Sequence, residues 1–261
     1  MEPKKQFIKT FESLARFKDR QSVFSDFVRL AVLEISQTTR LSLGWEKDEA
    51  DEKNYLEIAQ HYEANEVRGP ICELFSLMLL GLEQEGGDWL GRIYSELEFG
   101  NPGLGQFFTP YPISLLLAKL TCFDKELVQR QLEEQDYITL CEPACGAGGM
   151  ILAFAEEFRS AGFEPGRQLF VQASDLSSVA ASMCYVQLSL CGIPALVLQQ
   201  NTITQEVFWE RYTPTYFLKN WPNKLRYQKE KEKSLRITSN ASHVEKDITT
   251  PQIMNLQRLL F

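Results

Sequence analysis

A glycine-rich turn between a short β-rich run and an apolar helix constrains the fold of this 261-residue chain most strongly. Residues 137–141 predict a strand, and residues 142–149 then give Glu-Pro-Ala-Cys-Gly-Ala-Gly-Gly. Apolar residues at helical spacing follow, from Ile151 to Phe158. Glycines let the backbone bend sharply and approach a ligand, and the first amides of the next helix favour an anionic group. The turn therefore predicts an α/β domain with a ligand site at the ends of its strands.

The alternation of strand and helix continues beyond this turn. Residues 169–173 and 195–198 predict two further strands, separated by an apolar helix that ends near Gly192, and residues 206–212 are the candidate fourth strand. This order is typical of the first half of a doubly wound parallel sheet, truncated after its third or fourth strand. Such an open sheet would expose an apolar edge near residues 207–212, which favours a homodimer or a partner subunit.

Three parts are expected along the chain. Residues 1–100 predict a helical N-terminal domain, because apolar side chains recur there at helical spacing. Residues 101–217 would form the α/β core. Residues 218–261 predict a basic, polar C-terminal tail that ends in a short helix over the apolar residues 253–261.

Composition and charge limit the classes of function. Hydrophobic residues make up 44% and charged residues 24%, no apolar run approaches the roughly 20 residues of a membrane span, and a cytoplasmic protein is expected. Two histidines and no Cys-x-x-Cys pair make a metal site unexpected. The net charge of −8 disfavours nucleic acid. Residues 219–236, however, carry seven cations against two acids, which predicts either a DNA contact or a solvated segment.

Acidic and amide residues beside the strand ends indicate the ligand. The carboxylate of Glu142 would repel a pyrophosphate but attract an ammonium, as at the methionine end of S-adenosylmethionine (SAM). Asp175, just after the second strand, could accept hydrogen bonds from ribose hydroxyls or cap the next helix. Asn201, after the third strand, could meet an adenine edge or form a turn.

Three segments in this order resemble the N-6 adenine-specific DNA methyltransferases. They are residues 105–110 (Gly-Gln-Phe-Phe-Thr-Pro), residues 141–149 and residues 173–175 (Ala-Ser-Asp). The resemblance is closest to the modification (methyltransferase) subunit of type I restriction-modification systems. Residues 90–94 are also similar to the segment that precedes the first motif, so that the resemblance covers residues 88–203.

The resemblance implies a SAM-dependent methyltransferase core of the Rossmann-like type. It implies DNA as a partner, bound with low sequence specificity by this chain alone, and either specificity or restriction subunits or a second copy as further partners. The family usually has an acid where this chain has Asn201. The cofactor-binding residues that it implies are Phe108, Thr109, Pro110, Glu142, Pro143, Ala144, Gly146, Gly148, Asp175, Leu176 and Asn201.

The catalytic motif of the family departs from its usual form in this sequence. That motif is (Asn/Asp/Ser)-Pro-Pro-aromatic after the fourth strand, and no Pro-Pro occurs here. The nearest candidate holds Thr213, Pro214 and Tyr216, where the tyrosine could stack on a flipped base. A hydroxyl cannot reproduce an amide, so two functions stay open. One is an adenine methyltransferase, and the other is a non-catalytic SAM- or DNA-binding accessory or decoy subunit. A dinucleotide-dependent oxidoreductase is disfavoured by Glu142 and by the paired glycines.

Overall fold

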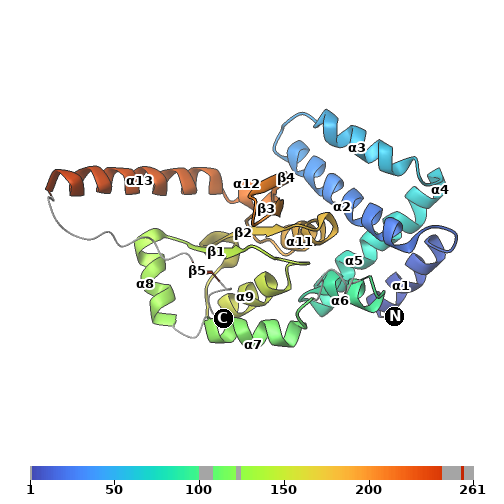
Figure 1. Cartoon of the computed structure of the whole chain (residues 1–261), viewed down its shortest axis with the longest axis horizontal. Helices are drawn as coiled ribbons and strands as arrows, with labels where there is room; N and C mark the ends of the chain where they lie inside the picture. The colour runs from blue at the N-terminus through green and yellow to red at the C-terminus, as the bar shows by residue number, and fades with distance from the viewer. Residues whose placement is uncertain (1, 100–107, 122–124, 243–253, 256–261) are drawn as a thin grey trace.

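The computed structural model describes residues 2–99, 108–121, 125–242 and 254–255, which form an α/β core with a helical N-terminal part (Figure 1). The core is built on one sheet of five strands, in the order β4-β3-β2-β1-β5. The strands are β1 (Ile138–Glu142), β2 (Leu169–Asp175), β3 (Ala195–Asn201), β4 (Glu206–Tyr212) and β5 (Met254–Asn255).

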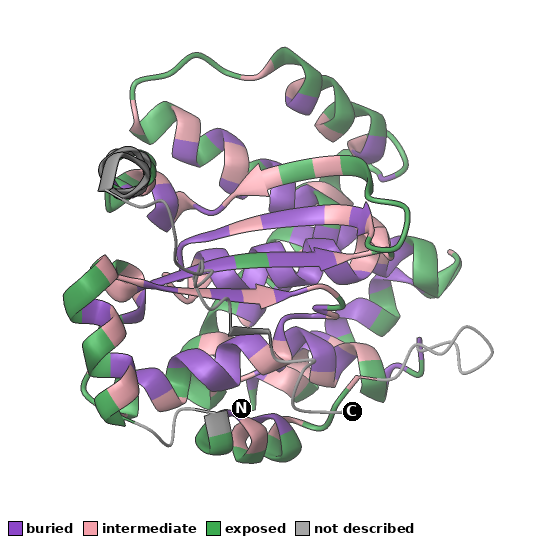
Figure 2. Cartoon of the chain, turned by 60° about the vertical axis from the view of Figure 1, so that its left-hand side comes forward, coloured by how far each residue is buried: buried purple, intermediate pink, exposed green. Residues whose placement is uncertain are grey.

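The three middle strands are parallel and form the buried centre of the sheet. Leu140, Val171 and Val197 are fully buried, and Figure 2 shows these strands largely buried along their length. Helices connect them in the right order for parallel pairing, because a crossover needs about a dozen residues or more. The connecting helices are α9 (Gly149–Ser160), α10 (Pro165–Gln168) and α11 (Ser178–Leu190).

The fourth strand differs from the parallel arrangement expected from the sequence. β4 pairs antiparallel with β3, and Asn201 lies opposite Glu206. Residues 202–205 alone connect the two strands, and so short a connection can form only a hairpin. β4 is the outermost strand on its side of the sheet, with Val207 and Phe208 about half exposed (45% and 51%). An exposed apolar strand at the sheet edge, as predicted from residues 207–212, is thus present.

The N-terminal helices pack onto the core instead of forming a separate hydrophobic interior. α2 lies against α11, and one continuous cluster of buried side chains includes Phe7 and Phe24 of the helical part and Leu140 and Val186 of the core. No helix within the described residues is both long and apolar enough to cross a membrane. The helices of this part are α1 (Pro3–Leu14), α2 (Arg20–Ser42), α3 (Glu49–Ala59), α4 (Ala64–Glu66), the π-helix η1 (Val67–Ile71), α5 (Cys72–Glu85) and α6 (Trp89–Glu96).

The C-terminal segment is largely a helix, where the sequence predicted a polar tail. Its Lys, Glu, Gln and Arg residues are strong helix formers. α13 begins against the core, where Trp221 is fully buried, and its far end extends away from the rest of the molecule (Figure 1). The short terminal helix expected over residues 253–261 is wrong at Met254–Asn255, which pair with β1; the rest of that segment lies outside the described residues. The remaining helices are α7 (Tyr111–Thr121), α8 (Lys125–Gln135), α12 (Pro214–Leu218) and α13 (Trp221–Ser242).

A substitution at Gly81 would test how α5 packs on α6. A Cβ atom there would lie 2.2 Å from Cε2 of Trp89, which is fully buried. We expect Gly81→Ala to lower the free energy of unfolding by about 1–3 kcal/mol, since the ring cannot move away. Gly69→Ala is the control, because a Cβ there meets no atom within 4 Å. Urea unfolding measures both, and equal stability of the two variants would contradict the packing of α5 on α6.

Candidate functional site

The glycine-rich turn after β1 has a backbone that only glycine adopts readily. Gly146 and Gly148 have φ angles of +54° and +94°, in the left-handed region. A Cβ atom on Gly146 would lie 2.9 Å from Cε1 of Phe108. Phe108 itself makes an edge-to-face contact with Tyr94, with ring centroids 5.2 Å apart. The two segments that carried the family resemblance, around residues 108 and 146, are therefore in direct contact.

Asp175 joins the end of β2 to this turn. Its Oδ2 accepts a hydrogen bond from the amide of Gly146 at 2.9 Å, and its Oδ1 accepts one from the amide of Ser177 at 2.8 Å. Ser177, not Asp175, caps α11. Burial raises the pKa of the Asp175 carboxyl, although the backbone hydrogen bonds oppose that change. A carboxylate oxygen accepts more than one hydrogen bond, so both oxygens stay available to ribose hydroxyls.

Glu142 is a buried acid whose charge is only partly compensated. The residue is 6% exposed, and Oε1 accepts a hydrogen bond from the amide of Ala144 at 3.1 Å. Oε2 has no hydrogen-bond partner among the described residues. Burial raises the pKa of Glu142, and the nearby charge of Asp175 raises it further. A cationic group bound here would relieve both effects, which fits the ammonium of an amino acid.

The turn after β3 completes the same edge of the sheet. Oδ1 of Asn201 accepts hydrogen bonds from the amides of Ile203 (3.1 Å) and Thr204 (3.2 Å). Thr202 donates a hydrogen bond through Oγ1 to the carbonyl of Pro143 at 2.8 Å. The turn-forming alternative for Asn201 therefore accounts for its amide oxygen, and its amide nitrogen is the atom left for a ligand.

The other predicted cofactor residues lie around these groups. Thr109 and Pro110 are exposed just before α7, and Leu176 is 59% exposed just after β2. Ala144 is exposed in the turn, whereas Gly148 is buried. The carboxyl ends of β1, β2 and β3 thus gather all the predicted cofactor residues that follow these strands.

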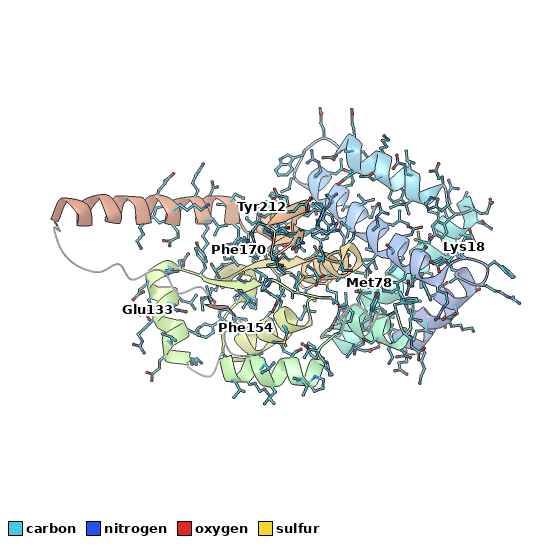
Figure 3. All side chains as sticks on the ribbon, in the orientation of Figure 1. Lys18, Met78, Glu133, Phe154, Phe170 and Tyr212 are labelled. Atoms are coloured by element: carbon cyan, nitrogen blue, oxygen red, sulfur yellow. The ribbon has the colours of Figure 1, made fainter. Side chains whose placement is uncertain are left out.

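The predicted catalytic residues Thr213, Pro214 and Tyr216 do not lie at this site. Oγ1 of Thr213 accepts a hydrogen bond from the amide of Ala195 and donates one to the carbonyl of Ile193, at the amino end of β3. Tyr216 is 9% exposed and stacks on Tyr212 at 4.1 Å, and Pro214 begins α12. Tyr212 and Phe170, labelled in Figure 3, mark this end of the sheet. The hairpin reverses the direction of β4. The segment that follows β4 therefore lies at the amino ends of β1 to β3, opposite the cofactor site.

A buried polar network under the turn was missed by the sequence analysis. Nε2 of Gln187 donates hydrogen bonds to Oδ1 of Asp88 (2.8 Å) and to the carbonyl of Ala147 (2.7 Å), while its Oε1 accepts one from the amide of Leu90 (2.9 Å). Asp88 also accepts from the amide of Gly91 at 2.9 Å. Asp88 before a helical pattern indicates an N-cap, but no local pattern pairs it with a residue 99 positions further on.

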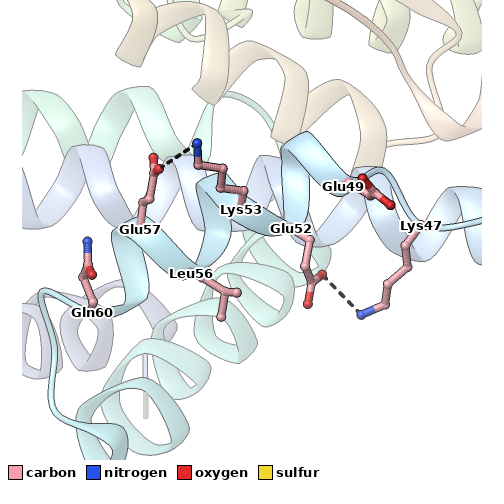
Figure 4. A pocket seen from close by; sticks show the side chains of 7 residues that line it. All are labelled: Lys47, Glu49, Glu52, Lys53, Leu56, Glu57 and Gln60. Carbon is pink, nitrogen blue, oxygen red and sulfur yellow. Dashed lines mark hydrogen bonds and ion pairs between the residues drawn. The ribbon is translucent and has the colours of Figure 1, made fainter.

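A hollow elsewhere on the described surface, along α3, lacks such a buried network. It is lined by charged side chains that pair with each other, Lys47 with Glu52 at 3.2 Å and Lys53 with Glu57 at 3.8 Å (Figure 4). Within the described ranges no group of three or more His, Cys, Asp or Glu side chains could hold a metal ion.

The geometry of this site is typical of one class of protein. A glycine turn between a parallel strand and a helix, with an acid at the end of the next strand, is typical of Rossmann-like domains that bind a nucleoside cofactor. The model of the N-6 DNA methylase family matches residues 87–254, well over half of the chain. The chain belongs to this family, and its fold is a truncated Rossmann-like methyltransferase fold. No curated protein and no solved structure matches it.

The buried carboxyl of Asp88 should make the stability depend on pH. Burial raises the pKa of Asp88, so its stabilising contribution is present below the ordinary aspartate pKa of about 3.9 and is lost as pH rises through the higher folded value. Asp88→Asn stays neutral and keeps an oxygen for Gly91 and Gln187. We expect the free energy of unfolding of this variant, relative to the parent, to increase between pH 4 and pH 7 (roughly the window in which carboxylates titrate). Urea unfolding across that window measures it, and a relative decrease would show that the fold stabilises the charged form.

Proposed function

We propose that this chain binds SAM at the carboxyl edge of β1–β3 and acts on DNA as a methyltransferase-like protein of the adenine N6 type. Members of the N-6 DNA methylase family are generally SAM-dependent, and the family implies DNA as the substrate. The single observation that carries the proposal is the partly uncompensated, buried carboxylate of Glu142 beside the turn that Asp175 holds open.

Each part of the cofactor has a complementary group at this edge. Glu142 would hold the ammonium, with Gly146 lining the amino-acid end of the cofactor and Thr109 and nearby backbone beside its methionine. Asp175 would accept hydrogen bonds from the ribose hydroxyls, and Leu176 and the Asn201 amide nitrogen would meet the adenine. When bound, SAM supplies an electrophilic methyl group. The protein's own residues bind and orient it and keep the Glu142 carboxylate away from bulk water.

The basic segment expected to meet DNA belongs mainly to α13. Lys224 makes contacts within the protein. Its Nζ lies 2.9 Å from Oδ2 of Asp136 and donates a hydrogen bond to the carbonyl of Arg167 at 2.7 Å. We propose that the remaining cations contact phosphates without sequence preference. We also propose that base recognition comes from a partner, as a specificity subunit of a type I restriction-modification system would supply. The cations of this segment are Lys219, Lys224, Arg226, Lys229, Lys231, Lys233 and Arg236.

A second candidate function is a non-catalytic accessory subunit that binds SAM or DNA. It is favoured by the placement of Thr213 and Tyr216 at the opposite edge from the cofactor site. A methyltransferase needs a polar acceptor for the target amine near the cofactor, and neither Thr213 nor Tyr216 lies there.

SAM should raise the melting temperature of the protein, since a ligand that binds the folded state stabilises it. Glu142→Gln and Asp175→Asn keep the shape of each side chain but remove its charge. We expect each to weaken SAM binding by roughly tenfold or more, because hydrogen bonds to charged groups contribute about 1.5–3 kcal/mol. Cys145→Ser should change the affinity little. Titration calorimetry measures the SAM affinity of the parent and the three variants. If high SAM does not raise the melting temperature of the parent, the cofactor assignment is contradicted.

Transfer of a tritiated methyl group from SAM to unmethylated DNA separates the two candidate functions. A methyltransferase would label adenine, and Asp175→Asn should then reduce the rate at low SAM by roughly tenfold, because it weakens SAM binding. Tyr216→Phe, at the opposite edge, is the control and should keep the parent rate. A SAM-induced shift without any labelling would assign the chain to the accessory function.

A further inference from the structure

A polar hollow of about 460 Å³ lies between the N-terminal helices and the side of the sheet formed by β3 and β4. Its walls come from α2, α3, the start of α11 and the β3–β4 hairpin, so both parts of the molecule build it. Most of the lining side chains carry hydrogen-bond donors. Those that matter here are Arg29, Asn54, Ser178, Ser182, Trp209 and Arg211.

Ser182 indicates that this hollow is suited to a ligand. Its residue is only 3% exposed, and its side chain makes no hydrogen bond with any described residue. Buried hydroxyls in folded proteins are nearly always hydrogen-bonded. The Ser182 hydroxyl is unpartnered but not fully enclosed, unlike the unpartnered hydroxyl of Ser189 on the same helix. Ser182 therefore opens onto the hollow that it lines.

The charges around the hollow favour an anion. Both terminal nitrogens of Arg211 bind the carboxylate of Asp51, at 2.6 and 2.8 Å, so this pair is neutral and fixed in place. Arg29 makes no ion pair with any described residue, and its positive charge stays uncompensated. Ser178 is the first residue of the 13-residue α11, whose amino end adds a partial positive charge. A donor-rich hollow with one free guanidinium matches a phosphate group, which arginine binds through paired hydrogen bonds.

The hollow is also joined to the cofactor site. Nε2 of Gln199, in its wall, donates a hydrogen bond to the carbonyl of Leu176 at 3.4 Å, and Ser178 follows Asp175 by three residues. Trp209, half-buried on β4, adds an aromatic surface on which a base could stack.

We propose that this hollow is a binding subsite for a phosphate group, and that the group is a backbone phosphate of the DNA strand that reaches the cofactor site. The assignment to DNA rests on the proposed function. The phosphate chemistry itself rests on Arg29 and Ser182, and a free phosphate is the other source of the same group.

Two pairs of variants test the subsite in the full chain. Arg29→Gln removes the free guanidinium, and Arg68→Gln is its control, an exposed arginine on η1 outside the hollow. Ser182→Ala removes the open hydroxyl, and Ser189→Ala is its control on the same helix. The probes are a fluorescein-labelled DNA duplex, followed by anisotropy over a series of salt concentrations, and inorganic phosphate, followed by tryptophan fluorescence. Melting temperatures confirm that each variant folds.

We expect Arg29→Gln to weaken duplex binding about tenfold and to reduce the slope of log affinity against log salt by roughly 0.9. Ser182→Ala should weaken it about threefold, and both controls should match the parent. If Arg29→Gln and Arg68→Gln behave alike with both probes, the subsite is refuted. Loss of inorganic phosphate binding with unchanged DNA affinity would overturn the assignment to DNA and leave a free phosphate as the ligand. SAM-induced thermal shifts, measured in parallel, report separately on the proposed function.

Discussion

The hydrogen bonds of the Gln187 side chain hold the cofactor turn in place. They join α11 to the carbonyl of Ala147 in the turn, to Asp88 and to the amide of Leu90 at the start of α6. Gln187 is fully buried, so a partner lost here would leave a polar group without water. Gly149 and Gly91 leave room for the Asp88 carboxylate, since a Cβ at either position would lie within 3 Å of its Oδ2. The conformation of the turn therefore depends on residues that precede it by about 60 positions.

Because of this network, the N-terminal helices and the α/β core form one packed unit. α2 covers α11, and the buried apolar cluster runs through both without a break. Asp51 of α3 pairs with Arg211 of β4, which fixes the edge of the sheet against the helices. The cofactor turn and the polar hollow beside Arg29 both need groups from the two parts. A ligand that binds at one site is thus in contact with elements that form the other.

The hairpin between β3 and β4 separates the two ends of the sheet chemically. The carboxyl ends of β1, β2 and β3 carry Glu142, Asp175 and Asn201, whose polar atoms face a shared edge. The amino ends are closed by an aromatic cluster, in which Trp221 donates a hydrogen bond to the carbonyl of Gly166 at 2.9 Å. A chain that returns antiparallel after residues 202–205 brings its next polar residues to this closed end. Thr213 is therefore a structural residue that ties β4 to the start of β3.

The sequence by itself determined the family, the strands β1 to β3 with their helices, and the position of the glycine turn. These features depend on local periodicity and on short motifs, which neighbouring residues encode directly. Only the tertiary structure decided the direction of β4, the place of Thr213 and Tyr216, and the pairing of Asp88 with Gln187. The direction of a strand depends on what its connection can span, and the partner of a buried polar group depends on which distant segments the core brings together. Neither is written in a run of adjacent residues.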